Sequence, residues 1–191
     1  MVLEEEKLYR NLKKCTFFTN EVTFLGYIKT AHDIKVDESK VEAIQSWRTP
    51  KSIHDVQSFH GLAVFYRRFI RNFSTIIAPM TEMIKCSSFK WTPKAQEAFE
   101  EIKSKLTQAA VLSLPYFDKA FKVECDASEV GIGGVFTQEG KPLAFFNEKL
   151  FYSRWKYSMY DKEFYAIVRC LEHGVTTWSL VSLFCIRTMR P

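Results

Sequence analysis

The apolar residues of this chain follow helical spacing over residues 53–107 and strand-like alternation over 121–146, and this change constrains the fold most. Residues that recur every three or four positions predict amphipathic helices. Alternation predicts strands, here over 121–125, 131–137 and 142–146. Helical spacing returns between Ser158 and His173. The order predicts a helical first half joined to a three-stranded sheet with one helix.

Shorter elements are predicted over the first 50 residues. A helix is expected over 4–13, followed by two strands, "CTFF" and "VTFLGYI", that a turn at Thr19 to Glu21 joins. Gly26 then lies late in the second strand, where a glycine often marks a bulge or the close approach of another backbone. Asp37 begins a helix that ends before Pro50.

The longest predicted helix begins at Ser52, which with Asp55 forms an S-x-x-D start, and runs to about Phe69. Its apolar stripe consists of Val56, Phe59, Ala63, Tyr66 and Ile70. Its other face carries His54, Gln57, Gly61, Phe65 and Arg68. A glycine inside a helix costs about 1 kcal/mol relative to alanine, so we expect Gly61 to serve a contact. Further helices are predicted over 75–85 and 93–107.

Charge and cysteine usage narrow the class of protein. The net charge is +5, with an excess of four basic residues over 1–90 (14 basic, 10 acidic) and of one over 91–191 (13 basic, 12 acidic). Such mild basicity permits nucleic-acid binding without demonstrating it. Five cysteines without a C-x-x-C pair argue against a disulfide framework or a zinc site and favour a reducing, intracellular setting, cytoplasm or nucleus. No signal peptide or membrane span is expected.

Two carboxylates are candidates for a metal site. Asp126 ends a predicted strand in "VECDAS", and Glu163 lies on the core side of the last predicted helix. Taken singly, Asp126 fits a turn-capping residue, and Glu163 fits an acid favoured by the dipole of a helix start. Taken together, on a strand and on a helix over the same sheet, they fit ligands of Mg²⁺, which prefers oxygen donors. Both interpretations stay open at this point.

Seven blocks of the sequence resemble the polymerase polyprotein of gypsy-type long-terminal-repeat retrotransposons, in order and at the usual spacing. These blocks are "EEKLYRNLKKCTFF", "FLGY", "KVEAIQSWRTPK", "SFHGLAVFYRRFI", "FKWTPKAQEAFEEIKSKLTQAAVLSLPYF", the region from "VECDAS" to "AFFNEKL", and "YDKEFYAIV". Together they cover about residues 1–173. The resemblance is specific because it depends on separate blocks that agree in order.

The resemblance implies a division into domains. The end of a reverse-transcriptase palm with its primer-grip hairpin would occupy 1–35, a helical thumb 36–90 and a connecting helix 91–110. The N-terminal part of a ribonuclease H-like domain would follow over 111–173. The expected fold class is therefore α+β or α/β: a palm-end β-hairpin and a helical thumb, then a truncated ribonuclease H-like sheet of three strands with one helix.

The resemblance also implies roles for single residues. In the primer grip, Leu25 and Gly26 would hold the primer end. The thumb helix would follow the minor groove of a template–primer duplex, with Gln57, Gly61 and Phe65 on the contacting face. Asp126 and Glu163 match the first two metal-binding carboxylates of ribonuclease H, which implies Mg²⁺ as cofactor. Phosphate-contacting arginines would be Arg67, Arg68 and Arg71, although these also fit a merely solvated face.

The sequence departs from the family pattern in two places. The polymerase signature Tyr-x-Asp-Asp does not occur, and neither does the third ribonuclease H carboxylate, expected in a T/S-D-H strand after Glu163. After His173 the chain reads "GVTTWSLVSLFCIRTMRP". With chosen synonymous codons, the neighbouring reading frame gives "WSDYLVSSEFILYSDHEA", which contains the missing S-D-H. Our hypothesis is a one-nucleotide deletion that leaves an out-of-frame tail over 174–191.

These observations predict a fragment of a retrotransposon reverse transcriptase/ribonuclease H. The parent is an RNA-directed DNA polymerase that also cleaves RNA in RNA–DNA hybrids with Mg²⁺. This chain is expected to bind hybrid or template–primer duplex and to be catalytically inactive. One alternative is weak Mg²⁺-dependent cleavage, and another is a domesticated, non-enzymatic nucleic-acid-binding module. The sheet is expected to leave an exposed edge and an uncovered apolar face, onto which the apolar tail would collapse without forming the native strand.

Overall fold

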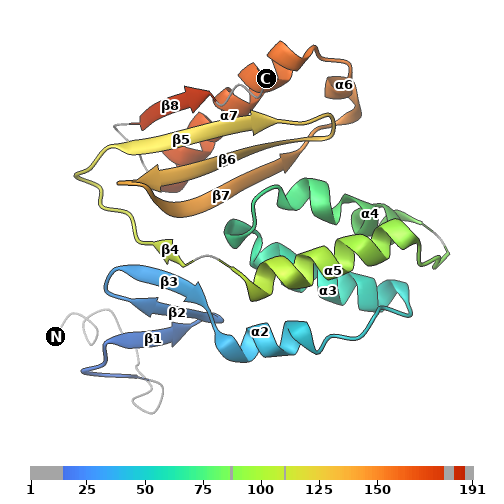
Figure 1. Cartoon of the computed structure of the whole chain (residues 1–191), viewed down its shortest axis with the longest axis horizontal. Helices are drawn as coiled ribbons and strands as arrows, with labels where there is room; N and C mark the ends of the chain where they lie inside the picture. Colours follow the sequence, from blue (N-terminus) through green and yellow to red (C-terminus); the bar gives the residue numbers. More distant parts are fainter. Residues whose placement is uncertain (1–14, 87, 110, 179–182, 188–191) are drawn as a thin grey trace, which may run out of the picture.

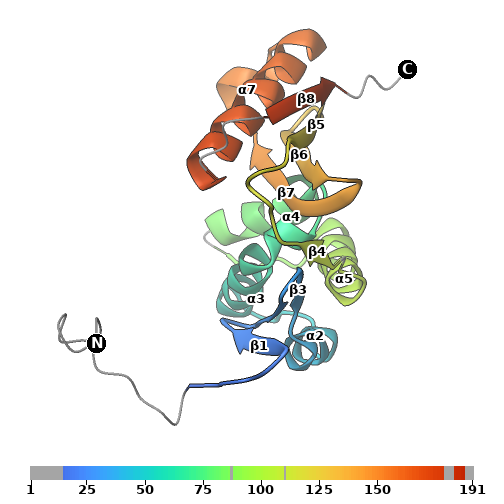
Figure 2. The same ribbon diagram turned by 90° about the vertical axis from the view of Figure 1, so that its left-hand side faces the viewer.

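The computed structural model of the chain describes residues 15–86, 88–109, 111–178 and 183–187. Two four-stranded sheets are present in these ranges, with a group of helices between them (Figures 1 and 2). The fold class predicted from sequence, a mixed α and β chain, is confirmed. The helix predicted over 4–13 lies outside the described residues.

The first sheet is built on a tight hairpin. Strands β1 (Glu21–Phe24) and β2 (Tyr27–Thr30) pair antiparallel, so only Leu25 and Gly26 form the loop. Both loop residues have positive φ angles, 50° and 76°, as a type I′ turn requires. The predicted turn at Thr19 to Glu21 and the predicted strand position of Gly26 are therefore wrong. Leucine is an unusual residue at positive φ, so the turn was hidden in an apolar run.

Two further strands complete the first sheet in the order β1-β2-β3-β4. Strand β3 (Asp33–Val36) follows the hairpin. The short strand β4 (Leu112–Ser113), which comes after the helices in the sequence, pairs antiparallel with β3. The segment "CTFF", at 15–18, forms no strand. Through β4, the segment that follows the helices thus returns to the sheet formed by the first part of the chain (Figure 1).

Four α-helices form the middle of the molecule. They are α2 (Glu38–Gln45), α3 (Ile53–Phe65), α4 (Phe73–Lys85) and α5 (Pro93–Thr107). The Ser52 hydroxyl accepts a hydrogen bond from the amide of Asp55, which confirms the predicted start of α3. Helix α3 ends at Phe65, earlier than predicted, and a 3₁₀ turn, η2 (Arg67–Phe69), follows.

The core of this half is the one that the apolar spacing predicts. The whole predicted stripe of α3 and η2 is buried: Val56, Phe59, Ala63, Tyr66 and Ile70. Phe59 meets Phe99 of α5 with ring centroids 4.6 Å apart. Phe99 belongs to the buried face that Ala98, Ile102 and Leu106 continue along α5. Apolar burial on this scale is the main stabilising term for such a helical layer.

The second sheet has the order β7-β6-β5-β8. Strands β5 (Phe121–Ala127), β6 (Gly131–Gln138) and β7 (Lys141–Lys149) form an antiparallel meander, close to the predicted ranges. The short helix α6 (Tyr152–Trp155) and the long α7 (Met159–Trp178) follow. Strand β8 (Leu183–Arg187) lies parallel to β5.

Strand β8 corrects the expectation of a three-stranded sheet, because the tail supplies a fourth strand. In register, Leu183 lies beside Phe121 and Arg187 beside Cys125. The edge of β5 presents unpaired amide and carbonyl groups, which accept an extended segment of suitable composition. The sequence "LFCIR" is such a segment, being rich in residues that favour strands.

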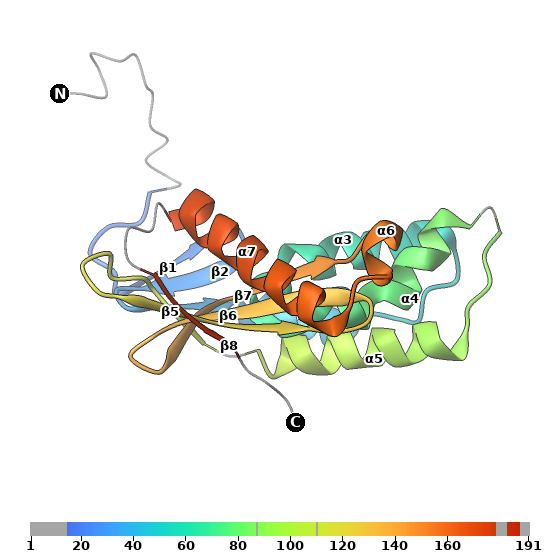
Figure 3. The same cartoon turned by 90° about the horizontal axis from the view of Figure 1, so that it is seen from above.

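Helix α7 covers one face of the second sheet (Figure 3). Ala166 and Cys170 are buried against the sheet residues Phe121, Val123 and Phe136. Met159, predicted to belong to this apolar stripe, is 51% exposed because it lies at the very start of the helix. Lys162, in the same turn of α7, is buried instead of Met159. The Lys162 ammonium lies 3.4 Å from the carbonyl oxygen of Glu129.

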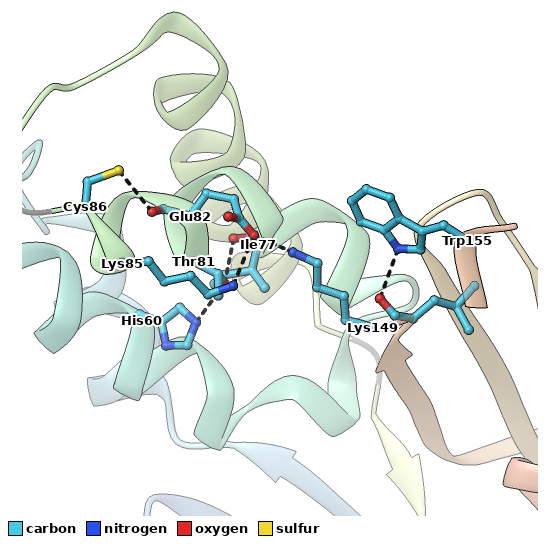
Figure 4. A network of polar contacts seen from close by, with 9 residues as sticks. His60, Ile77, Thr81, Glu82, Lys85, Cys86, Lys149 and Trp155 are labelled. Carbon is cyan, nitrogen blue, oxygen red and sulfur yellow. Dashed lines mark hydrogen bonds and ion pairs between the residues drawn. The ribbon is translucent and has the colours of Figure 1, made fainter. Parts of the chain in front are cut away.

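The sheet and the helices are joined directly. The side-chain amide of Asn147 on β7 donates a hydrogen bond of 3.0 Å to the carbonyl oxygen of Ile70. Lys149, at the end of β7, forms an ion pair of 2.6 Å with Glu82 of α4 (Figure 4). On the other side of α4, Thr81 lies 3.1 Å from the ring nitrogen of His60 on α3. Polar contacts therefore run from α3 through α4 to β7.

Candidate metal centre and nucleic-acid interface

Asp126 is placed by the alternation of strand β5. Its neighbour Cys125 is buried and lies opposite Gly134, beside helix α7. Because successive residues of a strand point to opposite faces, Asp126 and its ladder partner Gly133 belong to the face turned away from α7. The carboxylate is half-buried there, near the end of the strand.

Two glycines of β6 allow helix α4 to approach this face. A Cβ atom at Gly133 would lie 3.5 Å from Oδ1 of Asn72, and one at Gly131 would lie 3.3 Å from the Thr75 hydroxyl. Asn72 has a left-handed backbone, φ 58°, which asparagine tolerates better than most residues, and it directly precedes α4. The absence of side chains on β6 thus brings the first turn of α4 close to Asp126.

Asp126 and Glu163 line the same cavity, of about 360 Å³, although they are far apart in the sequence. Asn72, Ser74 and Thr75 contribute from α4, and Asn147 contributes from β7. Glu163 lies in the first turns of α7 and is half-buried. Carboxylate and amide oxygens are the donors that Mg²⁺ prefers, so the lining is chemically suited to a hard cation.

Among the described residues, Asp126 and Glu163 are the acids in the lining of this cavity. In the ranges that the structure describes, no three or more His, Cys, Asp or Glu side chains gather closely enough to hold a metal ion. The asparagines that face the cavity, Asn72 and Asn147, carried no signal in the sequence. Their positions depend on how α4 packs against the sheet, which local periodicity does not encode.

The face of α3 predicted to contact a duplex is exposed. Gln57, Gly61 and Phe65 lie one turn apart, and a Cβ atom at Gly61 would meet no atom within 4 Å. One side of the Phe65 ring stacks on Tyr27, with centroids 5.0 Å apart and planes inclined by 16°. The Tyr27 hydroxyl donates to the carbonyl oxygen of Phe65 at 2.9 Å. The end of α3 is therefore fixed to strand β2, while Gly61 leaves open space above the helix.

The three predicted phosphate-binding arginines are exposed and line two different cavities. Arg67 and Arg68 belong to η2 and line a cavity of about 200 Å³ together with His173. Burial, and then the positive charges of these two arginines, lower the pKa of His173. Arg71 instead lines a cavity of about 510 Å³ with Lys94 and Lys105.

The predicted primer-grip residues lie at the tip of the first hairpin. Leu25 is 67% exposed. The carbonyl oxygen of Gly26 accepts hydrogen bonds from the Tyr66 hydroxyl at 3.2 Å and from the amide of Asp37 at 3.1 Å. Burial raises the pKa of Tyr66 to about 12, so this hydroxyl stays a donor at neutral pH. The hairpin tip is thus held against the end of α3.

Comparisons with known proteins agree with this geometry. The family model "RNase H-like domain found in reverse transcriptase" matches residues 91–177. The Pol polyprotein of transposon 297 from Drosophila melanogaster is 38% identical over 87% of this chain. A Tf2 transposon polyprotein from Schizosaccharomyces pombe is 30% identical over 90% of it. An uncharacterized mitochondrial protein of Arabidopsis thaliana is 37% identical, over 60% of this chain and 73% of its own length.

Solved structures show the same fold. A foamy viral protease–reverse transcriptase in complex with RNA/DNA hybrid superimposes with a TM-score of 0.83 at 25% identity, over 94% of this chain and 25% of the viral chain. The dRH form of the foamy viral enzyme, in complex with double-stranded DNA, gives a TM-score of 0.85 at 25% identity, over all of this chain and 34% of the viral chain.

The sheet with its covering helix, tied to a group of helices, is that of a reverse transcriptase with an RNase H-like domain. The chain belongs to the family of Pol polyproteins of gypsy-type retrotransposons, as a fragment of its reverse transcriptase/ribonuclease H region. It spans 16% and 13% of the transposon 297 and Tf2 polyproteins. Among the described helices, none has the length and apolarity needed to cross a membrane.

Proposed function

We propose that this chain binds a nucleic-acid duplex, an RNA–DNA hybrid or a template–primer, with the exposed face of α3 against the minor groove. In the same complex, Asp126 and Glu163 bind Mg²⁺ beside the duplex. The observation that carries the proposal is the cavity that these two acids share with the first turn of α4. The reverse transcriptases of similar fold were solved with RNA/DNA hybrid and with double-stranded DNA, which supports a duplex as the ligand.

The α3 face suits a close approach of a duplex backbone. Gly61 has no side chain, and the space above it is open. Gln57, one turn earlier, offers an amide that can donate to groove edges or sugars, and Phe65 offers a ring that is 44% exposed. Arg67 and Arg68 follow at the end of the helix, where they attract phosphates independently of sequence.

The two acids would act through the cation. A divalent ion held by carboxylate oxygens neutralises a phosphate and polarises its oxygens when it is bound. Asp126 would supply oxygens from the sheet and Glu163 from α7, while Asn72 orients its amide toward the same cavity. In this assignment α4 is more than a support, because its first turn forms one wall of the cation site.

The domain division follows the same proposal. Residues 1–35 would be the end of the palm, 36–90 the thumb, 91–110 the connecting helix and 111–173 the ribonuclease H-like part. Two direct contacts of β7 with the helical part, Lys149 with Glu82 of α4 and Asn147 with Ile70 after η2, support treating thumb and sheet as one duplex-binding body. The comparisons do not favour the alternative of a domesticated, non-enzymatic module.

The test is binding of a fluorescein-labelled RNA–DNA hybrid, followed by anisotropy. In the Gly61→Leu variant, the added side chain enters open space and does not disturb the core, but it blocks the approach of a backbone. We expect at least tenfold weaker hybrid binding and an unchanged or higher melting temperature, because glycine disfavours helices. Ser104→Leu on the exposed side of α5 is the matched control. Equal hybrid affinity of Gly61→Leu and the wild type would overturn the α3 assignment.

A further inference from the structure

Beside the cavity, one stretch of the chain combines aromatic and basic residues without a single acid. Residues 149–160 read "KLFYSRWKYSMY", with five aromatic residues and three cations. The stretch contains α6 and the loop that leads into α7. None of its residues has a role in the proposed duplex contact. We refer to the side chains of 151–160, together with Phe164, as the aromatic strip.

The rings of the aromatic strip are unusually exposed. Tyr152 is 73% exposed, Tyr160 74% and Phe164 69%. Large aromatic side chains contribute most when they are buried, so a group of exposed rings along one stretch of the chain marks a contact surface. Part of the strip is held in place, since the Trp155 indole donates a hydrogen bond of 3.0 Å to the carbonyl oxygen of Leu150 (Figure 4). The Tyr152 and Trp155 rings lie side by side, with centroids 4.3 Å apart.

The charges of the strip are available to a ligand. Lys149 is paired with Glu82, but Arg154 and Lys156 have no ion pair with any residue in the described ranges. The Arg154 guanidinium lies over the Tyr165 ring, 4.4 Å from its centroid, which holds it near the strip. The nearest acids in sequence are Glu148, which is paired with Arg169, and Asp161, which accepts a hydrogen bond from Ser158 at the start of α7. Glu163 of the cavity follows.

We propose that the aromatic strip binds single-stranded nucleic acid, RNA or DNA, by stacking bases on its rings while Arg154 and Lys156 attract the phosphates. Interleaved aromatic and basic residues on an exposed surface are the combination that holds single strands without sequence preference. An apolar protein partner would need the aromatic rings but not the two unpaired cations. The charge pattern therefore favours a polyanion over a protein.

The aromatic strip lies beside the cavity that Asp126 and Glu163 line, which suggests a role for single-strand binding. Met159 and Glu163 line the cavity of the two acids, so the strip begins where the cavity ends. A strand that separates from the duplex at the cavity would pass directly onto the strip. This last step rests on the proposed function, whereas the binding of a single strand does not.

The test uses the full chain and two fluorescein-labelled single strands, oligo(dT) and oligo(rU) of twelve nucleotides. Tyr152→Ala/Tyr160→Ala removes two rings that are 73% and 74% exposed, together with the contact between the Tyr152 and Trp155 rings. We expect this double variant to bind both strands at least tenfold more weakly than the wild type, since each stacked base depends on an aromatic partner. Tyr152→Phe/Tyr160→Phe should bind like the wild type. Phe117→Ala, at a ring that is 66% exposed elsewhere on the sheet domain, is the matched control and should also bind like the wild type.

Two further readouts separate the possible results. Lys156→Gln should weaken binding and reduce its salt dependence, and bound strands should quench the fluorescence of Trp155. The proposal is overturned if the wild type binds neither strand, or if the double alanine variant binds as tightly as the wild type. A strip that serves only contacts between copies of this chain would give concentration-dependent association, lost in the alanine variant, without strand binding. Gly61→Leu should leave strand binding intact, which distinguishes this proposal from the duplex proposal.

Discussion

Glu82 on helix α4 and Lys149 at the end of β7 form an ion pair of 2.6 Å that joins the helical part of the chain to the second sheet. Lys85 approaches the same carboxylate at 3.4 Å. These lysines lower the pKa of Glu82 below its ordinary value of 4.5. One carboxylate thus links α4 to β7, and both of these segments contribute residues to the lining of the candidate cation site.

The pH dependence of the free energy of unfolding tests the ion pair between Glu82 and Lys149. Because the pKa of Glu82 is lowered in the folded state, its contribution is complete above pH 4.5 and is lost as the pH falls through the folded pKa. Both side chains are partly exposed, so we expect Glu82→Gln to cost less than about 1 kcal/mol at pH 7 and clearly less than that near pH 3. Urea denaturation at both pH values measures the difference. An equal loss at pH 7 and pH 3 would contradict the assignment, and Glu101→Gln on α5 is the control.

Gly134 tests the packing of α7 on the sheet. A Cβ atom there would lie 2.5 Å from the sulfur of Cys170, which is fully buried. We expect Gly134→Ala to destabilise the fold by about 1–3 kcal/mol through overpacking. At Gly133 the added atom would make ordinary contacts, so Gly133→Ala should cost clearly less. Denaturant midpoints of both variants decide between these outcomes.

A second substitution checks the cause of that loss. Cys170→Ala removes the sulfur, so the double variant with Gly134→Ala should recover part of the stability that Gly134→Ala alone loses. Additive losses in the double variant would show that the sulfur is not the obstacle, because residues in contact are expected to couple.

The salt dependence of hybrid binding tests the arginines. Arg67 and Arg68 lie together at the end of α3, while Arg71 lines a different cavity. If both residues of the pair contact phosphates, Arg67→Ala/Arg68→Ala should reduce the slope of log K against log salt by about 2. Anisotropy titrations between 50 and 300 mM salt provide the slope. An unchanged slope would mean that the pair is only a solvated face, and the slope of Arg71→Ala separately tests the third arginine.

The transcript sequence across codons 170–191 tests the frameshift hypothesis. In the neighbouring frame, the Asp of "SDH" falls at position 188, one residue beyond β8. Since Arg187 lies beside Cys125, the parallel register would bring that Asp next to Asp126.

We expect a chain made in the neighbouring frame to cleave the RNA of a hybrid with Mg²⁺, and the present chain to leave it intact. Codons that give no "SDH" in any frame would refute the hypothesis.

The sequence predicted those parts of the fold that local patterns determine. The stripe from Val56 to Ile70 and the strands of the second sheet follow from spacing alone, and both are confirmed. The hairpin turn was missed because Leu25 adopts a positive φ angle that its residue type disfavours. Strand β8 was missed because pairing with β5 depends on a distant edge, not on a pattern within the tail.

The candidate site was predicted in part. The helix face of Glu163 and the family resemblance point to Asp126 and Glu163, and the structure places both in the lining of one cavity. Their metal-binding role remains a proposal. Asn72 and Asn147 could not be predicted, because they reach the cavity through the packing of α4 against two glycines of β6. Side chains that one element contributes to the site of another leave no periodic signal.

The most direct test of the account is binding of Mn²⁺, as a spectroscopic substitute for Mg²⁺, to the complex of this chain with an RNA–DNA hybrid. Electron paramagnetic resonance of unbound Mn²⁺ measures the affinity. We expect Asp126→Asn/Glu163→Gln to bind Mn²⁺ at least tenfold more weakly than the wild type, with Glu129→Gln, at an exposed acid, unchanged. Equal Mn²⁺ affinity of the double variant and the wild type would contradict the assignment of these carboxylates to a cation site.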